Sequence, residues 1–186
     1  MREIKLTRIR DYDYSRSGAY FVTVCAHNRE MLFGEIADCE IILNECGDIV
    51  NRCRRKIPAH FAQVELDGFV IMTNHVHGII TINSVGAGFS RPNVENAKCN
   101  IIGRGDRAPT LGQIVAYFKY EAAKQVNKLR NAPGVRFWQR NYYEHIIRND
   151  SELNRIRKYI IENPLKWDID SENPDALLRK DYKEKL

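Results

Sequence analysis

The chain has 186 residues, 44% of them hydrophobic and 28% charged, which is long and apolar enough for one domain with a buried core. Its net charge of +5 suits a polyanionic partner. The five cysteines are odd in number and show no C-x-x-C spacing, which argues against a disulfide framework or a zinc knuckle and for reduced thiols. The sequence has no signal peptide and no apolar run of membrane-spanning length, so we expect a cytoplasmic protein without a membrane partner.

The first half of the chain predicts a strand, a hairpin, a helix and a pair of strands joined by a tight turn. Asn44 is placed to cap the helix, and Pro58 to close it. One face of that helix is apolar, and the other carries Arg52, Arg54, Arg55 and Lys56. The predicted elements span residues 20–25, 31–43, 44–57, 64–73 and 75–82.

The second half predicts two further helices and a short fourth strand. Thr110 and Gln113 have the spacing of a capping box, and an apolar stripe continues to Leu129. The last helix begins near Asp150 and is ended by Pro164. With a strand near 136–139, the order becomes βαββαβ. We therefore predict an α+β, ferredoxin-like sandwich with an antiparallel sheet, helices on one face, and a C-terminal helix and tail.

Two segments fall outside these elements, within what we expect to be a single domain over residues 1–186. Residues 83–109 form a long irregular stretch that carries Arg91, Lys98, Arg104 and Arg107. Loops of this length are usually functional or disordered, so we predict a mobile basic loop, with plain disorder as the alternative. Residues 168–186 predict a highly charged tail laid over the domain.

The triplet His75-Val76-His77 lies inside an apolar run that predicts a strand. Residues two apart on a strand point to the same face, about 7 Å apart, so both imidazoles can approach one metal ion. Burial alone gives no reason for two polar rings on one face. The alternative is a pair of hydrogen-bonded core histidines.

A third ligand is expected about seventy residues downstream, in a stretch that contains Tyr142, Tyr143 and His145. If this stretch is helical from Asn141, Tyr142 and His145 are i, i+3 neighbours on one face. His145 would then complete the metal site, with the phenol of Tyr142 beside it. A tyrosine next to a divalent ion in a basic protein suggests nucleophilic attack on a phosphodiester. Ordinary amphipathic packing of the two tyrosines is the alternative, and a rotated helix would make Tyr143 the nucleophile.

Taken together, these features resemble the REP-associated tyrosine transposases, IS200-like members of the single-tyrosine HUH (His, hydrophobic, His) superfamily. Five blocks in the right order carry the resemblance, at residues 18–24, 70–77, 111–119, 138–145 and 159–164. It implies the ferredoxin-like fold, with the histidines on a central strand, and Mg²⁺ or Mn²⁺ as the metal. Coordination preference alone would equally allow Mn²⁺ or Zn²⁺. Matching to a Trp-Gln-x-x-Tyr pattern selects Tyr142 as the nucleophile.

The resemblance also implies an activity, namely a metal-dependent single-strand DNA endonuclease and strand transferase that acts on hairpin-forming repeats through a 5′-phosphotyrosine. The expected DNA contacts come from basic residues: Lys119, Arg140, Arg52, Arg55, Arg104 and Arg107. Lys119 could also assist the phenol, or be merely solvated. The protein would be a monomer or homodimer, nucleoid-associated when bound to DNA. The alternatives are a non-catalytic hairpin-binding protein derived from a transposase, and a phosphoesterase that uses water.

Overall fold

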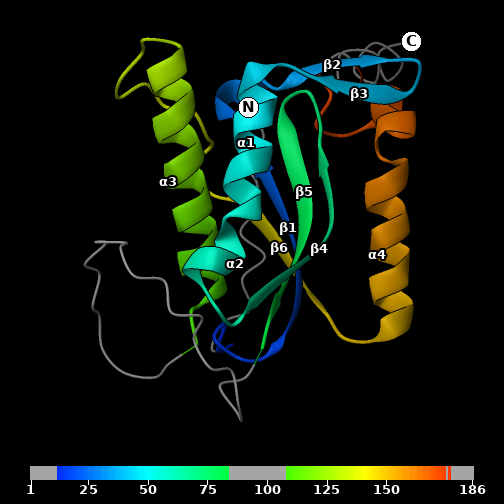
Figure 1. Cartoon of the computed structure of the whole chain (residues 1–186). Helices are drawn as coiled ribbons and strands as arrows, with labels where there is room; N and C mark the ends of the chain where they lie inside the picture. Colours follow the sequence, from blue (N-terminus) through cyan, green and yellow to red (C-terminus); the bar gives the residue numbers. More distant parts are fainter. Residues whose placement is uncertain (1–11, 84–107, 175, 177–186) are drawn as a thin grey trace.

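The centre of the molecule is a four-stranded antiparallel sheet with the strand order β4-β5-β1-β6 (Figure 1). The computed structural model describes residues 12–83, 108–174 and 176. The sheet strands are β1 (Gly18–Cys25), β4 (Val64–Ile71), β5 (His75–Ile82) and β6 (Tyr143–Ile147). Helices α1 (Glu45–Arg55) and α3 (Leu111–Leu129) cover one face, and α4 (Asp150–Glu162) lies on the other (Figure 1). The predicted antiparallel α+β fold is confirmed.

Smaller elements complete the described part of the chain. A hairpin of β2 (Gly34–Ala37) and β3 (Glu40–Leu43) precedes α1 and confirms the predicted excursion. A one-turn helix, α2 (Ile57–His60), follows α1, so Pro58 lies inside this turn instead of closing the longer helix. Short 3₁₀ turns are η1 (His27–Arg29) and η2 (Pro164–Ile169).

Side-chain caps fix where the helices begin. The Asn44 side chain accepts hydrogen bonds from two backbone N–H groups of the first turn of α1. Thr110 and Gln113 form the predicted capping box at α3, and Asn149 caps α4 through the N–H of Glu152. These side chains pair backbone donors that a helix leaves unsatisfied.

The strict alternation of β1 divides its side chains between two apolar clusters. Tyr20, Val22 and Val24 face α1 and α3 within the larger cluster. Phe21 points to the other face and packs with residues of α4 that include Ile156. Because a strand side-chain period is two, every residue paired with β1 is assigned to one of these faces by its register.

The fourth strand is where the sequence-based prediction was wrong. Residues 136–139 contribute only an isolated bridge, between Trp138 and Ala26, and the strand itself is β6. The helix predicted from Asn141 is also wrong, because this stretch pairs with β1, Tyr143 opposite Thr23. Pairing with the open edge of β1 therefore decided the conformation of a stretch whose local sequence is compatible with either helix or strand.

Two predictions lie outside the described residues. One is the basic loop at 84–107, with Arg91, Lys98, Arg104 and Arg107, and the other is the part of the charged tail at residue 175 and beyond 176. Within the described ranges, no helix has the length and apolar character needed to cross a membrane. The described cysteines Cys25, Cys39, Cys46 and Cys53 are all free.

Candidate metal centre and nucleophile

The two histidines of the His-Val-His triplet open β5 and point toward the α4 side of the sheet. His75 lies opposite Cys25 of β1, and His77 lies opposite Thr23. His75 is fully buried and His77 is 3% exposed. The predicted sharing of one strand face is therefore confirmed. Their Nε2 atoms are 3.0 Å apart, close enough for one ion to contact both.

The outer nitrogen of each ring has its own fixed partner. His75 Nδ1 lies 2.8 Å from the side-chain oxygen of Asn74, whose amide nitrogen donates to the carbonyls of Arg29 and Glu172. Because that amide group is oriented by two acceptors, its oxygen faces His75, and Nδ1 of His75 must donate. His77 Nδ1 lies 2.8 Å from Oγ1 of Thr23, which can accept in the same way. Such partners orient imidazoles for metal binding through Nε2.

Burial also sets the protonation of the pair. It lowers the pKa of His75 to about 3, with a smaller contribution from the Arg29 charge. It lowers the pKa of His77 well below the usual value, and the neighbouring His75 adds to the effect. Both rings are therefore neutral at pH 7, which is the form that binds a metal.

One carboxylate reaches the histidines from the segment that follows α4. A carboxylate oxygen of Asp170 and the ring nitrogens of His75 and His77 all lie within 4.8 Å of one another. Asp170 also accepts a 3.2 Å hydrogen bond from Nδ2 of Asn163. Oδ1 of Asn163 is buried and has no hydrogen-bond partner within the described part of the chain. Two imidazoles and one carboxylate suit Mn²⁺ or Zn²⁺ better than Mg²⁺, so the residues fit a divalent metal.

A tyrosine of α4 completes the constellation. The hydroxyl of Tyr159 lies 3.3 Å from Nε2 of His77, and the two rings are 5.2 Å apart. Tyr159 is 40% exposed, so the residue lies partly at the surface beside the buried pair. Burial raises the pKa of Tyr159 to about 12, the Asp170 carboxylate adds to the rise, and Asn163 opposes it.

The structure places the predicted tyrosine and third histidine elsewhere. Tyr142 precedes β6 and packs against the cluster beneath α1 and α3, on the face opposite His75 and His77. His145 points to the α4 side, but its Nε2 lies 2.8 Å from a carboxylate oxygen of Glu152. The predicted helical i, i+3 pairing of Tyr142 and His145 is wrong because both belong to an extended segment. The group of side chains that could hold a metal contains Asp170 where His145 was expected.

The described residues among the predicted DNA contacts fall into two groups, one that is engaged within the protein and one that is exposed. The ammonium group of Lys119 donates to the carbonyls of residues 139, 140 and 141, at 2.5, 3.2 and 3.4 Å, and burial lowers its pKa to about 8. Lys119 therefore holds the turn before β6. Arg52 and Arg55 on α1, and Arg140, are exposed, as a phosphate contact requires.

Sequence reasoning missed the residues that the structure brings to the histidines. Tyr159 and Asn163 stand four apart just before Pro164, a spacing that puts both on one face at the end of a helix. That signal was present. Asp170 carried no local signal, because it reaches the site only through the path of the chain after α4.

The segment after α4 covers this centre. Glu172 accepts a 3.3 Å hydrogen bond from the thiol of Cys25 and forms a 3.0 Å ion pair with Arg29. The ring of Trp167 lies 6.2 Å from that of His75. These contacts hold the segment after α4 beside the histidine pair.

Fold and centre together define an α+β protein that carries a histidine pair on a central strand. No family model matches the chain. A Haemophilus influenzae protein, described as uncharacterized, is 39% identical over 171 residues, which cover 88% of this chain and 89% of that protein. The chain belongs to the family of this protein.

Among solved structures, that of a REP-associated tyrosine transposase bound to a REP hairpin is similar, with a TM-score of 0.56 and 20% identity. The match covers 87% of this chain and 74% of the transposase chain. The resemblance to the REP-associated tyrosine transposases is confirmed in this structural likeness, which is one of fold.

Proposed function

We propose that this protein is a metal-dependent single-strand DNA endonuclease and strand transferase, with Tyr159 as the nucleophile. The observation that carries the proposal is the 3.3 Å approach of the Tyr159 hydroxyl to Nε2 of His77, at the only cluster of three metal-ligating groups among the described residues. Tyr159 takes the role that sequence matching gave to Tyr142, because Tyr142 lies on the other face of the sheet.

The proposed metal ligands are His75, His77 and Asp170, with the amide oxygen of Asn163 as a fourth. A bound Mn²⁺ or Mg²⁺ would polarise a non-bridging phosphate oxygen and favour the phenolate of Tyr159. Asn74 and Thr23 keep the two imidazoles turned so that Nε2 faces inward. His145 holds Glu152 and stays outside this ligand set.

The chemical step uses the phenol directly. Its oxygen attacks the scissile phosphorus, the P–O3′ bond breaks, and the leaving strand takes a proton to end in a 3′-hydroxyl. The other strand remains attached as a 5′-phosphotyrosine. A different 3′-hydroxyl can reverse the step and join a new strand, without ATP, because the ester conserves the bond energy.

The proposed substrate is a folded single strand that contains a hairpin. The net charge of +5 and the exposed Arg52, Arg55 and Arg140 favour binding to phosphates. The solved transposase with the similar fold is bound to a REP hairpin, which supports this substrate class. A perfect duplex should be a poor substrate, since opening it costs a few kcal/mol per unstacked base.

Two other functions use the same fold. A hairpin-binding protein without cleavage would not need the neutral histidine pair beside a phenol. A phosphoesterase that uses water would keep the metal ligands but leave Tyr159 without a role. Only the proposed function gives a covalent protein–DNA product.

Covalent capture tests the proposal. A 3′-labelled hairpin with a single-stranded extension is incubated with Mn²⁺ and run on a denaturing protein gel, because the fragment that carries the 3′ end is the one that stays on the protein. We expect an adduct that Tyr159→Phe abolishes while hairpin binding persists. Tyr142→Phe and Tyr143→Phe are the matched controls and should still form the adduct. Adduct formation by Tyr159→Phe would refute the assignment, and cleavage without any adduct would indicate the water-using phosphoesterase.

A further inference from the structure

The edge strand β4 contains an irregularity that connects the two helical layers. The register of β4 against β5 shifts between Leu66 and Phe69, which takes Asp67 and Gly68 out of the regular ladder. Asp67 Oδ1 accepts a 2.6 Å hydrogen bond from the N–H of Gly68, which fixes the carboxylate on its own turn. The bulge therefore presents the carboxylate and the backbone carbonyl of Asp67 at the edge of the sheet.

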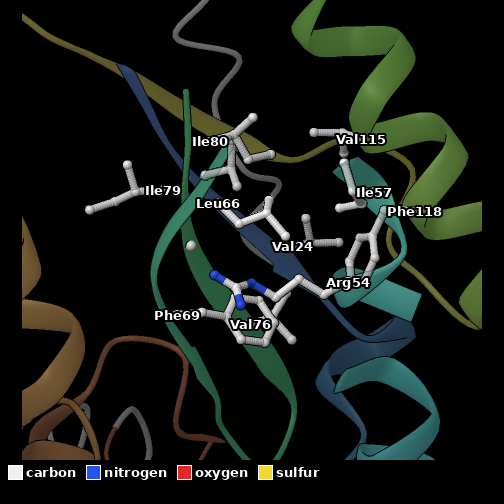
Figure 2. Close-up of a pocket in the computed structure, with 12 residues that line it drawn as sticks. Val24, Arg54, Ile57, Leu66, Phe69, Val76, Ile79, Ile80, Val115 and Phe118 are labelled. Carbon is white, nitrogen blue, oxygen red and sulfur yellow. The ribbon is translucent and has the colours of Figure 1, made fainter. Parts of the chain in front are cut away.

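Helix α1 holds this bulge from one face of the sheet. The guanidinium group of Arg54 donates to the backbone carbonyl of Asp67. It also lies over the ring of Phe69, 4.3 Å from the ring centroid (Figure 2). The ring of Phe69 in turn lies against Gly78, where an added Cβ would meet it at 2.9 Å. Burial lowers the pKa of Arg54 to about 10, so the side chain stays charged at pH 7. These contacts therefore fix the position of the bulge relative to α1.

Helix α4 is held by the same bulge from the opposite face. Arg157 donates from Nε and Nη2 to both carboxylate oxygens of Asp67, at distances of 2.5–3.1 Å. This hydrogen bonding is the main reason that the pKa of Asp67 is lowered, so the carboxylate is charged at pH 7. A two-point guanidinium–carboxylate contact fixes direction as well as distance.

A second contact holds α4 near its N-terminus. Glu152 accepts hydrogen bonds from the backbone N–H of Arg148 and, by its distance of 2.8 Å, pairs with His145 of β6. The helix is thus tied to β6 at residue 152 and to β4 at residue 157. Two ties along one helix restrict both its rotation and its sliding over the sheet.

We infer that the Asp67–Arg157 contact sets the position of Tyr159 over His77, and that Arg157 is a positioning residue for the reaction. This inference rests on the proposed function. Tyr159 follows Arg157 by two residues, about 3 Å along the helix axis and about 200° around it. Arg157 therefore cannot touch the phenol, yet any rotation of α4 about its axis moves the phenol away from His77. A displacement of about 1 Å at a reacting group can cost about 100-fold in rate.

The test compares the rate of adduct formation with the affinity for the hairpin. At saturating hairpin DNA and Mn²⁺, we expect Asp67→Asn and Arg157→Met to slow adduct formation at least about tenfold. The hairpin Kd should stay within about twofold, because neither residue is proposed to contact DNA. The reversed pair, Asp67→Arg with Arg157→Asp, should recover most of the rate. Lys158→Ala is the matched control, because it removes a surface ion pair with Glu162 on the same helix and should leave the rate unchanged.

The outcomes separate this inference from the proposed function. Wild-type adduct formation with unchanged rates in Asp67→Asn and Arg157→Met would overturn the positioning role alone. A rate loss that follows a parallel loss of hairpin affinity, or that the folded reversed pair fails to recover, would also overturn it. Absence of the adduct in the wild-type protein would overturn the proposed function itself. A thermal unfolding midpoint well above the assay temperature shows that a variant is folded under the assay conditions.

Discussion

Acid should destabilise the metal-free protein through its buried histidine pair. In the unfolded chain His75 takes up a proton as the pH falls through about 6.5, whereas in the folded protein burial lowers its pKa to about 3. Between these values protons bind the unfolded state preferentially, so the stability that is present above pH 6.5 is lost as the pH falls. A pH of 5 lies about 1.5 units below the pKa of His75 in the unfolded chain and still above its pKa in the folded protein. His75 alone therefore lowers the free energy of unfolding by about 2 kcal/mol at pH 5.

Urea unfolding at a series of pH values from 8 to 5, with a chelator present, measures this loss. The wild-type protein should lose about 2 kcal/mol more than His75→Gln, which cannot titrate at that position. His60→Gln removes an exposed histidine and is the control. Parallel curves for the wild-type protein and His75→Gln would show that the pair is not held neutral in the folded protein, and would refute the reasoning.

Two further predictions concern other residues of the centre and its surroundings. Lys119→Met should lower the free energy of unfolding by about 1.5–3 kcal/mol, because charged hydrogen bonds to the turn before β6 are lost. Chemical denaturation measures this, and an unchanged free energy of unfolding would contradict the structural role of Lys119. Asp170→Asn should weaken Mn²⁺ binding at least about tenfold by calorimetric titration, whereas the exposed Asp168→Asn should not; equal affinities would remove Asp170 from the ligand set.

Much of the fold follows from local patterns in the sequence. Asn44 and the Thr110–Gln113 box fix helix starts through bonds within a few residues, so these starts could be predicted. The His75–His77 pair could be predicted for a similar reason, because a strand period of two needs no knowledge of the rest of the molecule.

The parts that could not be predicted depend on long-range pairing. The stretch around Tyr142 and His145 has no single period, and its strand character comes from the free edge of β1. Because the stretch is extended and not helical, Tyr142 packs on the α3 side of the sheet and His145 pairs with Glu152. Asp170 reaches the histidines through the fold of the segment after α4, which no short motif describes.

The central claim, that Tyr159 is the nucleophile at the histidine centre, is tested most directly by locating the covalent bond. Trypsin cuts this sequence so that residues 159–166 form one peptide and residues 141–148 another, with both other candidate tyrosines on the second. After reaction with a short hairpin in Mn²⁺ and nuclease trimming, mass spectrometry should find the nucleotide mass on Tyr159 in peptide 159–166. The same mass on peptide 141–148 would contradict the account and return the role to Tyr142 or Tyr143.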